Sequence, residues 1–134
     1  MGGEAWQYFT PFVEDISIAL QRLREQEFKA GRYYFPGEKP KTIEELIEHF
    51  PQCGTRSILD IQKISETPGF LIVSPFLPDE LEEWFGPNKP TRKSVEYKLE
   101  DIFESLYERG EGKYMIVFKG NKPHEILFAG YSID

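Results

Sequence analysis

The sequence contains little cysteine and histidine. Among its 134 residues there is one cysteine, Cys53, and there are two histidines, His49 and His124. A single cysteine excludes an internal disulfide, and a structural zinc site draws its four ligands mostly from cysteine and histidine. We therefore expect neither a disulfide-stabilised fold nor a metal site.

Long apolar runs are also absent. The longest, residues 114–118 and 126–129, are much shorter than the roughly 20 residues of a membrane-spanning helix. The first residues, MGGEAWQYF, have neither the basic region nor the apolar core of a signal peptide. We therefore expect a cytoplasmic protein with no membrane partner.

The chain has no excess of basic charge. Its formal net charge is −7, and residues 42–111 hold fifteen acidic and seven basic side chains, whereas residues 1–41 hold six of each. An acidic surface repels phosphate backbones, and no stripe of lysine and arginine compensates for it. The charge pattern therefore argues against a nucleic acid partner.

The short motifs of several large enzyme classes are missing as well. The chain has no G-x-S-x-G, no G-x-G-x-x-G, no G-x-x-x-x-G-K-[ST] and no H-E-x-x-H. These motifs present a nucleophile, cradle the phosphates of a nucleotide or bind zinc. We therefore expect no cofactor.

The sequence does contain enough apolar material for one core. Hydrophobic residues make up 40% of the chain and aromatic residues 15%. A chain of this length buries roughly two thirds of the surface that its unfolded form exposes. We therefore expect a single domain that covers residues 1–134.

Four segments combine apolar residues at helical spacing with start and stop signals. Thr10 and Pro11 are a start signal for the first helix, Thr42 and Glu45 form a capping box before the second, and Thr91 is an N-cap for the last. Each segment is followed by a glycine or a proline. The predicted helices cover residues 11–30, 43–50, 78–85 and 92–109.

Short runs rich in β-branched and aromatic residues predict strands. They cover residues 5–9, 32–35, 70–74, 114–118 and 125–131, and residues 56–64 fit either a strand or a helix. Gly120, Asn121 and Lys122 predict the turn of a C-terminal hairpin. Together the elements predict an α+β fold, with a mixed or mainly antiparallel sheet and about four helices packed mostly on one face.

One stretch, HFPQCGTRSILDI, gathers residue types that occur in active sites. It contains His49, Cys53, Arg56 and Asp60. A thiol nucleophile needs a nearby base and hydrogen-bond donors, and His49 is the base that this stretch offers. The alternative is a small buried thiol, with Arg56 paired to an acid such as Asp60 or Glu48. We favour the alternative, because Pro51 interrupts the helical spacing between His49 and Cys53.

A second candidate lies on the last predicted helix. Glutamates recur there at four-residue spacing with tyrosines beside them: Glu96, Tyr97, Glu100, Glu104, Tyr107 and Glu108. On a helix this spacing places the carboxylates along one outward face. Such a face is either a solvated surface or a docking surface for a basic or mixed-charge protein, with the tyrosines supplying contact area.

Five segments spread over most of the chain carry a resemblance. They read AWQYF, EFKAGRY, GTRSILDI, FGPNKPTR and ILFAGYSID. The sequence resembles a family of small, uncharacterised bacterial proteins of the cyanobacterial type. That family has no established activity, so the resemblance implies one bacterial domain and assigns no catalytic residue.

These observations predict a non-enzymatic, cytoplasmic protein-binding or regulatory module, similar in role to an inhibitor or an immunity protein. The acidic middle of the chain and the tyrosine-flanked glutamates support this hypothesis. The alternative hypothesis is a small thiol-dependent enzyme that uses Cys53 and His49. The sequence leaves the partner, the strand order and the oligomeric state open.

Overall fold

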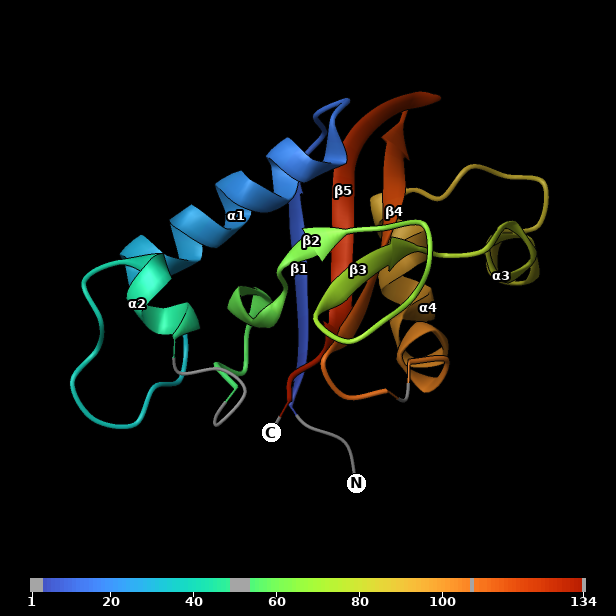
Figure 1. Ribbon diagram of the computed structural model, residues 1–134. Coiled ribbons are helices and arrows are strands. Elements are labelled where there is room, and N and C mark those ends of the chain that lie inside the picture. The colour runs from blue at the N-terminus through green and yellow to red at the C-terminus, as the bar shows by residue number, and fades with distance from the viewer. Residues whose placement is uncertain (1–3, 49–53, 107, 134) are drawn as a thin grey trace.

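The computed structural model describes residues 4–48, 54–106 and 108–133. A five-stranded sheet forms its centre, and helices lie on both faces of that sheet (Figure 1). The elements in chain order are β1 (Ala5–Pro11), α1 (Ile16–Ala30), α2 (Ile43–Ile47), the 3₁₀ helix η1 (Ile58–Asp60), β2 (Lys63–Ile64), β3 (Ile72–Pro75), α3 (Pro78–Phe85), α4 (Arg92–Glu104), β4 (Glu111–Lys119) and β5 (Lys122–Tyr131).

The sheet is mixed, as the sequence predicted. Its strand order is β1-β5-β4-β3-β2. The pairs β1–β5 and β5–β4 are antiparallel, whereas β4–β3 and β3–β2 are parallel. The predicted C-terminal hairpin is β4–β5, in which Lys119 pairs with Lys122. Gly120 and Asn121 between them both have positive φ, which is the backbone of a type I′ turn.

The helices divide between the two faces of the sheet. Ile126 and Phe128 of β5 point toward α1 and belong to one apolar cluster. Leu127 and Ala129 point to the other side, where they join a second cluster with residues of α3 and α4. The prediction that the helices pack mostly on one face is therefore wrong. The physical reason is visible in β5 itself, because a strand that is apolar on both sides needs cover on both.

Helix α1 begins later than predicted. Asp15 is its N-cap and accepts a hydrogen bond from the Ser17 N–H at 3.0 Å. Thr10 and Pro11, which we predicted to start the helix, instead complete β1. The predicted end is confirmed, since Gly31 adopts φ 71° and its N–H reaches the carbonyls of Glu27 and Phe28.

Helix α4 ends earlier than predicted. It stops at Glu104, and the Ser105 hydroxyl donates to the Ile102 carbonyl at 2.6 Å. Gly110, the predicted stop signal, does have a positive φ of 74°. It uses that conformation to enter β4, with its N–H bonded to the Tyr131 carbonyl at 2.9 Å. Glu108 therefore lies beyond the helix.

Two predicted strands are absent or reduced in the described chain. Residues 32–35 form a loop in which the Tyr34 N–H donates to the Thr55 carbonyl at 2.7 Å. Within residues 56–64, η1 replaces the first part and only Lys63 and Ile64 form a strand. The hydroxyl of Ser57 caps η1 by accepting from the Leu59 N–H. Local side-chain bonds of this kind compete with a sheet ladder.

Two glycines give β4 and β5 a flat surface under an indole ring. Gly112 and Gly130 are directly paired across the two strands, and Trp6 is buried against both. A Cβ atom added at Gly112 would lie 2.6 Å from the Trp6 ring, and one added at Gly130 would lie equally close. These positions therefore need glycine for close approach rather than for backbone freedom.

Candidate functional site

The cysteine stretch is only partly within the described structure. The predicted thiol nucleophile, Cys53, and its predicted base, His49, lie outside the described residues. The described part, residues 54–60, carries the other two candidates, Arg56 and Asp60. Both side chains have clear surroundings, and the two do not form a pair.

Asp60 is a structural anchor. Its side chain is fully buried. One carboxylate oxygen accepts from the Thr55 N–H at 2.6 Å and from the Thr55 hydroxyl at 2.7 Å, and the other accepts from the Ile133 N–H at 3.1 Å. These bonds tie η1 to the chain segment after β5. A carboxylate held in this way fixes the fold.

Arg56 points to the surface. It is exposed and has a positive φ of 56°. Its guanidinium carbon lies 4.1 Å from the centre of the Tyr34 ring, which is the geometry of a cation–π contact. The expected ion pair of Arg56 with Asp60 or Glu48 is not formed. The physical reason is that the Asp60 carboxylate already accepts hydrogen bonds from Thr55 and Ile133.

A polar cluster that the sequence did not reveal lies between α1 and the sheet. Glu27 is buried and receives Arg32 in a bidentate ion pair, with a shortest distance of 2.7 Å. The nearby Tyr8 hydroxyl accepts from the Ile58 N–H at 3.4 Å. Burial and, to a smaller extent, the Glu27 charge raise the pKa of Tyr8 to about 12. In the sequence, the sign of this cluster is that Glu27 occupies a position of the first helix that faces the core.

On the other side of the molecule, α4 presents its predicted acidic face. Glu96, Glu100 and Glu104 are all exposed, opposite the buried Val95 and Ile102. Glu96 is engaged by Arg92 at 3.1 Å, and the same guanidinium contacts Glu125 at 2.9 Å. The acidic face therefore has two parts. Glu96, near the start of the helix, is in an ion pair, and Glu100 and Glu104 form the second part.

The carboxylates of Glu100 and Glu104 form no ion pair with another described residue. Within the described parts of the chain, no lysine or arginine nitrogen lies within 4 Å of the Glu100 or Glu104 carboxylate. The one lysine on this stretch, Lys98, is directed to Asp101 at 3.7 Å. Tyr97 stands beside them with 85% of its surface exposed. Tyr107, the second predicted tyrosine, lies outside the described residues.

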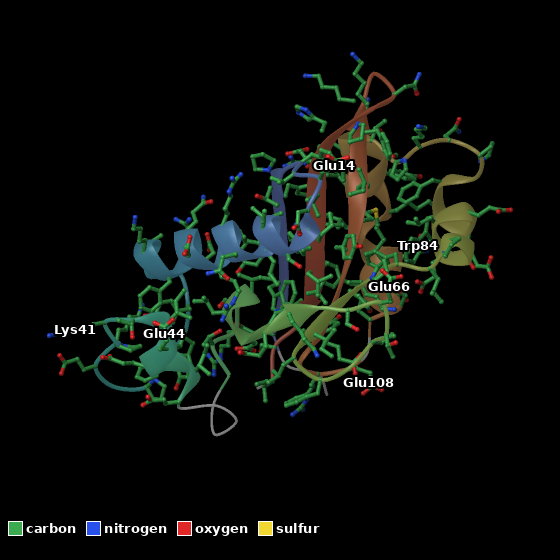
Figure 2. The ribbon with its side chains drawn as sticks, turned by 45° about the horizontal axis from the view of Figure 1, so that its top comes forward. Glu14, Lys41, Glu44, Glu66, Trp84 and Glu108 are labelled. Carbon is green, nitrogen blue, oxygen red and sulfur yellow. The ribbon has the colours of Figure 1, made fainter. Side chains whose placement is uncertain are left out.

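Glu108 contributes to a cavity beyond the end of α4. The cavity has a volume of about 340 Å³, and its carboxylates are Glu80, Glu108 and Glu111. Leu77, with 56% of its surface exposed, forms part of the apolar wall. Burial, and then the charge of Glu108, raise the pKa of Glu111, while Lys113 opposes them. Figure 2 shows Glu108 at the end of the molecule opposite Glu14.

A second cavity lies where α3 meets the start of α4. Its volume is about 350 Å³, and Trp84, Tyr97 and Lys98 are among its lining residues. The Trp84 ring packs edge-on against Phe76, with 5.4 Å between the ring centres. Figure 2 shows Trp84 on the side of α3 that faces the rest of the molecule.

We define the acidic surface as Glu100, Asp101, Glu104 and Glu108 together with Tyr97.

His124 and the described acidic side chains do not form a metal site. His124 is exposed next to the hairpin turn, as the last strand begins. Across the described residues, no group of three or more histidine, cysteine or acidic side chains is arranged to hold a metal ion. No described helix is long and apolar enough to cross a membrane.

Comparison of the chain with protein-family models, with curated proteins and with solved structures found no match. The resemblance to a family of small bacterial proteins therefore stays a prediction.

Proposed function

We propose that this protein is a non-enzymatic recognition module that binds a basic segment of a partner protein through the acidic surface. The observation that carries the proposal is the pair of exposed carboxylates, Glu100 and Glu104, that have no cation beside them in the described structure. A role in regulation, as an inhibitor or an immunity-type protein, follows the same logic.

The arrangement of charge supports this function over simple solubility. Each pair of like charges four residues apart on a helix destabilises that helix by about 0.2–0.5 kcal/mol. Arg92 relieves this repulsion at Glu96, and Lys98 is directed to Asp101. Neither cation contacts Glu100 or Glu104, so a partner's lysine or arginine would supply the missing charge.

Tyr97 supports the same surface from its apolar side. Tyr97 is 85% exposed, and the Lys98 ammonium lies 5.9 Å from the centre of its ring, so most of the ring faces water. Tyrosine is enriched at protein interfaces because it adds contact area at a small entropic cost and carries a hydroxyl. The cavity that contains Glu108 extends the surface past the helix and adds further carboxylates.

The alternative, a thiol enzyme, has no supporting observation among the described residues. Arg56 stacks on Tyr34, and Asp60 is enclosed by backbone and hydroxyl donors. Alkylation of Cys53 across pH tests this alternative separately, because a catalytic thiolate reacts well below the usual thiol pKa of about 8.5.

The proposal is tested by reversing charge on one helix and comparing with an equal reversal on another. The test variant is Glu100→Lys with Glu104→Lys. The matched control is Glu14→Lys with Glu25→Lys, two exposed positions of which the first lies just before α1 and the second within it. Helix α1 packs on the face of the sheet opposite α4. Both variants change the net charge by the same amount, so general electrostatic attraction to basic proteins is equal in the two.

The measurement is affinity capture followed by mass spectrometry, at low and at moderate salt. We expect a basic protein, or one with a basic segment, to be retained by the native chain and the α1 control but lost by the α4 variant. Moderate salt should weaken the retained complex, because exposed charges are screened. Equal loss with both variants, or equal retention, would contradict a specific role for the acidic surface.

A further inference from the structure

Strand β1 is one of the two outer strands of the sheet. Two hydrogen bonds show which of its backbone groups face β5 and which face outward. The Phe12 N–H donates to the His124 carbonyl at 3.0 Å, and the Ser132 N–H donates to the Glu4 carbonyl at 2.8 Å. Both fall in the β1–β5 register, so even-numbered residues of β1 direct their backbone groups toward β5.

The odd-numbered residues therefore direct their backbone groups outward. Ala5, Gln7 and Phe9 each present one N–H and one carbonyl on that edge, and in the described chain none of these groups has a hydrogen bond to another segment. Pro11 has no N–H and ends the row. In Figure 1 β1 forms the border of the sheet next to β5, with α1 crossing in front of it.

This edge lacks the devices by which monomeric proteins protect such strands. Natural edges carry charged side chains, central prolines, bulges or very short strands. β1 has seven residues, AWQYFTP, with no charge and with proline only at its end. Its pairing with β5 runs without a register shift. An uncharged, regular and unpaired edge is a template for a further strand.

We propose that two copies of this chain pair antiparallel through β1, in a two-fold symmetric register centred on Gln7. This register pairs Ala5 of one copy with Phe9 of the other and Gln7 with Gln7. It satisfies the outward N–H and carbonyl of all three residues in each copy. The two five-stranded sheets then form one continuous ten-stranded sheet.

The strand is suited to a second copy because it is self-complementary. A two-fold axis brings identical residues together, so a charge near the centre would face itself and repel. The central residues are neutral, and Gln7 is exposed, so its amide can bond to the same amide across the axis. This inference does not depend on the acidic surface, which lies on α4 and just beyond its end.

The register is tested with cysteine variants in a Cys53→Ser background. In the proposed pair the two copies of residue 7 face each other with about 5.5 Å between Cα atoms. Gln7→Cys should therefore be linked into a covalent dimer by a short bifunctional thiol reagent. Ala5→Cys should not, because the two copies of residue 5 are roughly 14 Å apart along the strands.

The association itself is measured by sedimentation equilibrium with two edge variants. Gln7→Pro removes an outward N–H and leaves every bond to β5 in place, and Gln7→Lys sets two like charges across the axis. We expect the native chain to dimerise and both variants to be monomeric, with a dissociation constant raised at least about tenfold. Circular dichroism checks that each variant is folded, and Gln7→Lys keeps the test valid if the proline variant is not.

Three results would overturn the proposal. A native chain that stays monomeric at millimolar concentration shows that the edge does not self-associate and leaves it to a strand of another protein. A dimer that survives both variants places the interface elsewhere. Equal cross-linking at positions 5 and 7 contradicts the register.

Discussion

The two faces of the sheet use polar residues in opposite ways. On the α1 side, Asp60 and Glu27 are buried and bonded within the protein. On the α4 side, the layer beneath the helix is apolar, and the carboxylates of Glu100 and Glu104 are exposed with no cation beside them among the described residues. Polar groups on the first face hold the fold together, whereas on the second face Glu100 and Glu104 are the groups that we propose bind a partner.

We expect this difference to separate the residues that determine stability from those that we propose for recognition. Substitutions on the α1 side should change the free energy of unfolding and leave the acidic surface intact. Substitutions on the acidic surface should do the reverse.

Asp60→Ala should have the largest effect on stability. Among the described residues it removes the acceptor for three hydrogen bonds, and it leaves the N–H groups of the buried Thr55 and the half-buried Ile133 unpaired. We expect a loss of about 3–5 kcal/mol in the free energy of unfolding, measured by denaturant titration. Glu66→Ala, at an exposed position, is the control. A loss below about 1 kcal/mol would show that Asp60 is not an anchor.

Gly112→Ala should have an intermediate effect. The added methyl group would lie 2.6 Å from the Trp6 ring, so the ring or the strand must shift. Overpacking of this kind costs about 1–3 kcal/mol. In a Trp6→Phe background the same change should cost less, because the smaller ring leaves room. Equal losses in the two backgrounds would mean that the indole does not rest on this glycine.

Glu111→Gln should have a small effect that depends on pH. The pKa of Glu111 is raised by burial and by Glu108, so the folded protein holds this proton more tightly than the unfolded chain does. Stability therefore falls as pH rises from the unfolded-state pKa through the raised value, and stays lowered above it. Glu80 and Lys113 face the same cavity and are unchanged in the variant.

We expect Glu111→Gln to be slightly more stable than the native chain at pH 7, by less than about 1 kcal/mol because the site is open to solvent. The difference should disappear below about pH 4, where both states are protonated. Thermal melts over this pH range measure it. A native chain that is the more stable one at pH 7 would reverse the assigned sign.

Much of the fold could be predicted from local patterns. Thr42, Thr91 and Gly31 end or begin helices as expected, and the turn at Gly120 and Asn121 closes the predicted hairpin. These signals depend on neighbours a few residues away. The sequence also placed Glu100 and Glu104 on an outward helical face, since that needs only the helical period.

The errors involve partners far apart in sequence. Residues 56–64 were open between strand and helix, because the bond of Asp60 to Ile133 spans 73 residues. The placement of α3 and α4 opposite α1 depends on where the parallel pair β3–β4 sits in the sheet. Glu108 was expected on α4, but Gly110 serves β4 instead. Local patterns carry no information about such contacts.

The most direct test of the acidic surface is a nuclear magnetic resonance titration with a short peptide of alternating lysine and alanine. We expect backbone amide shifts to concentrate at residues 97–104 and 108, with few changes in or next to α1, where Glu25 is exposed on the helix and Glu14 is exposed just before it. Glu100→Lys with Glu104→Lys should abolish the shifts while changing the free energy of unfolding by no more than about 0.5 kcal/mol. Shifts of similar size on α1, or none at all on α4, would contradict the account.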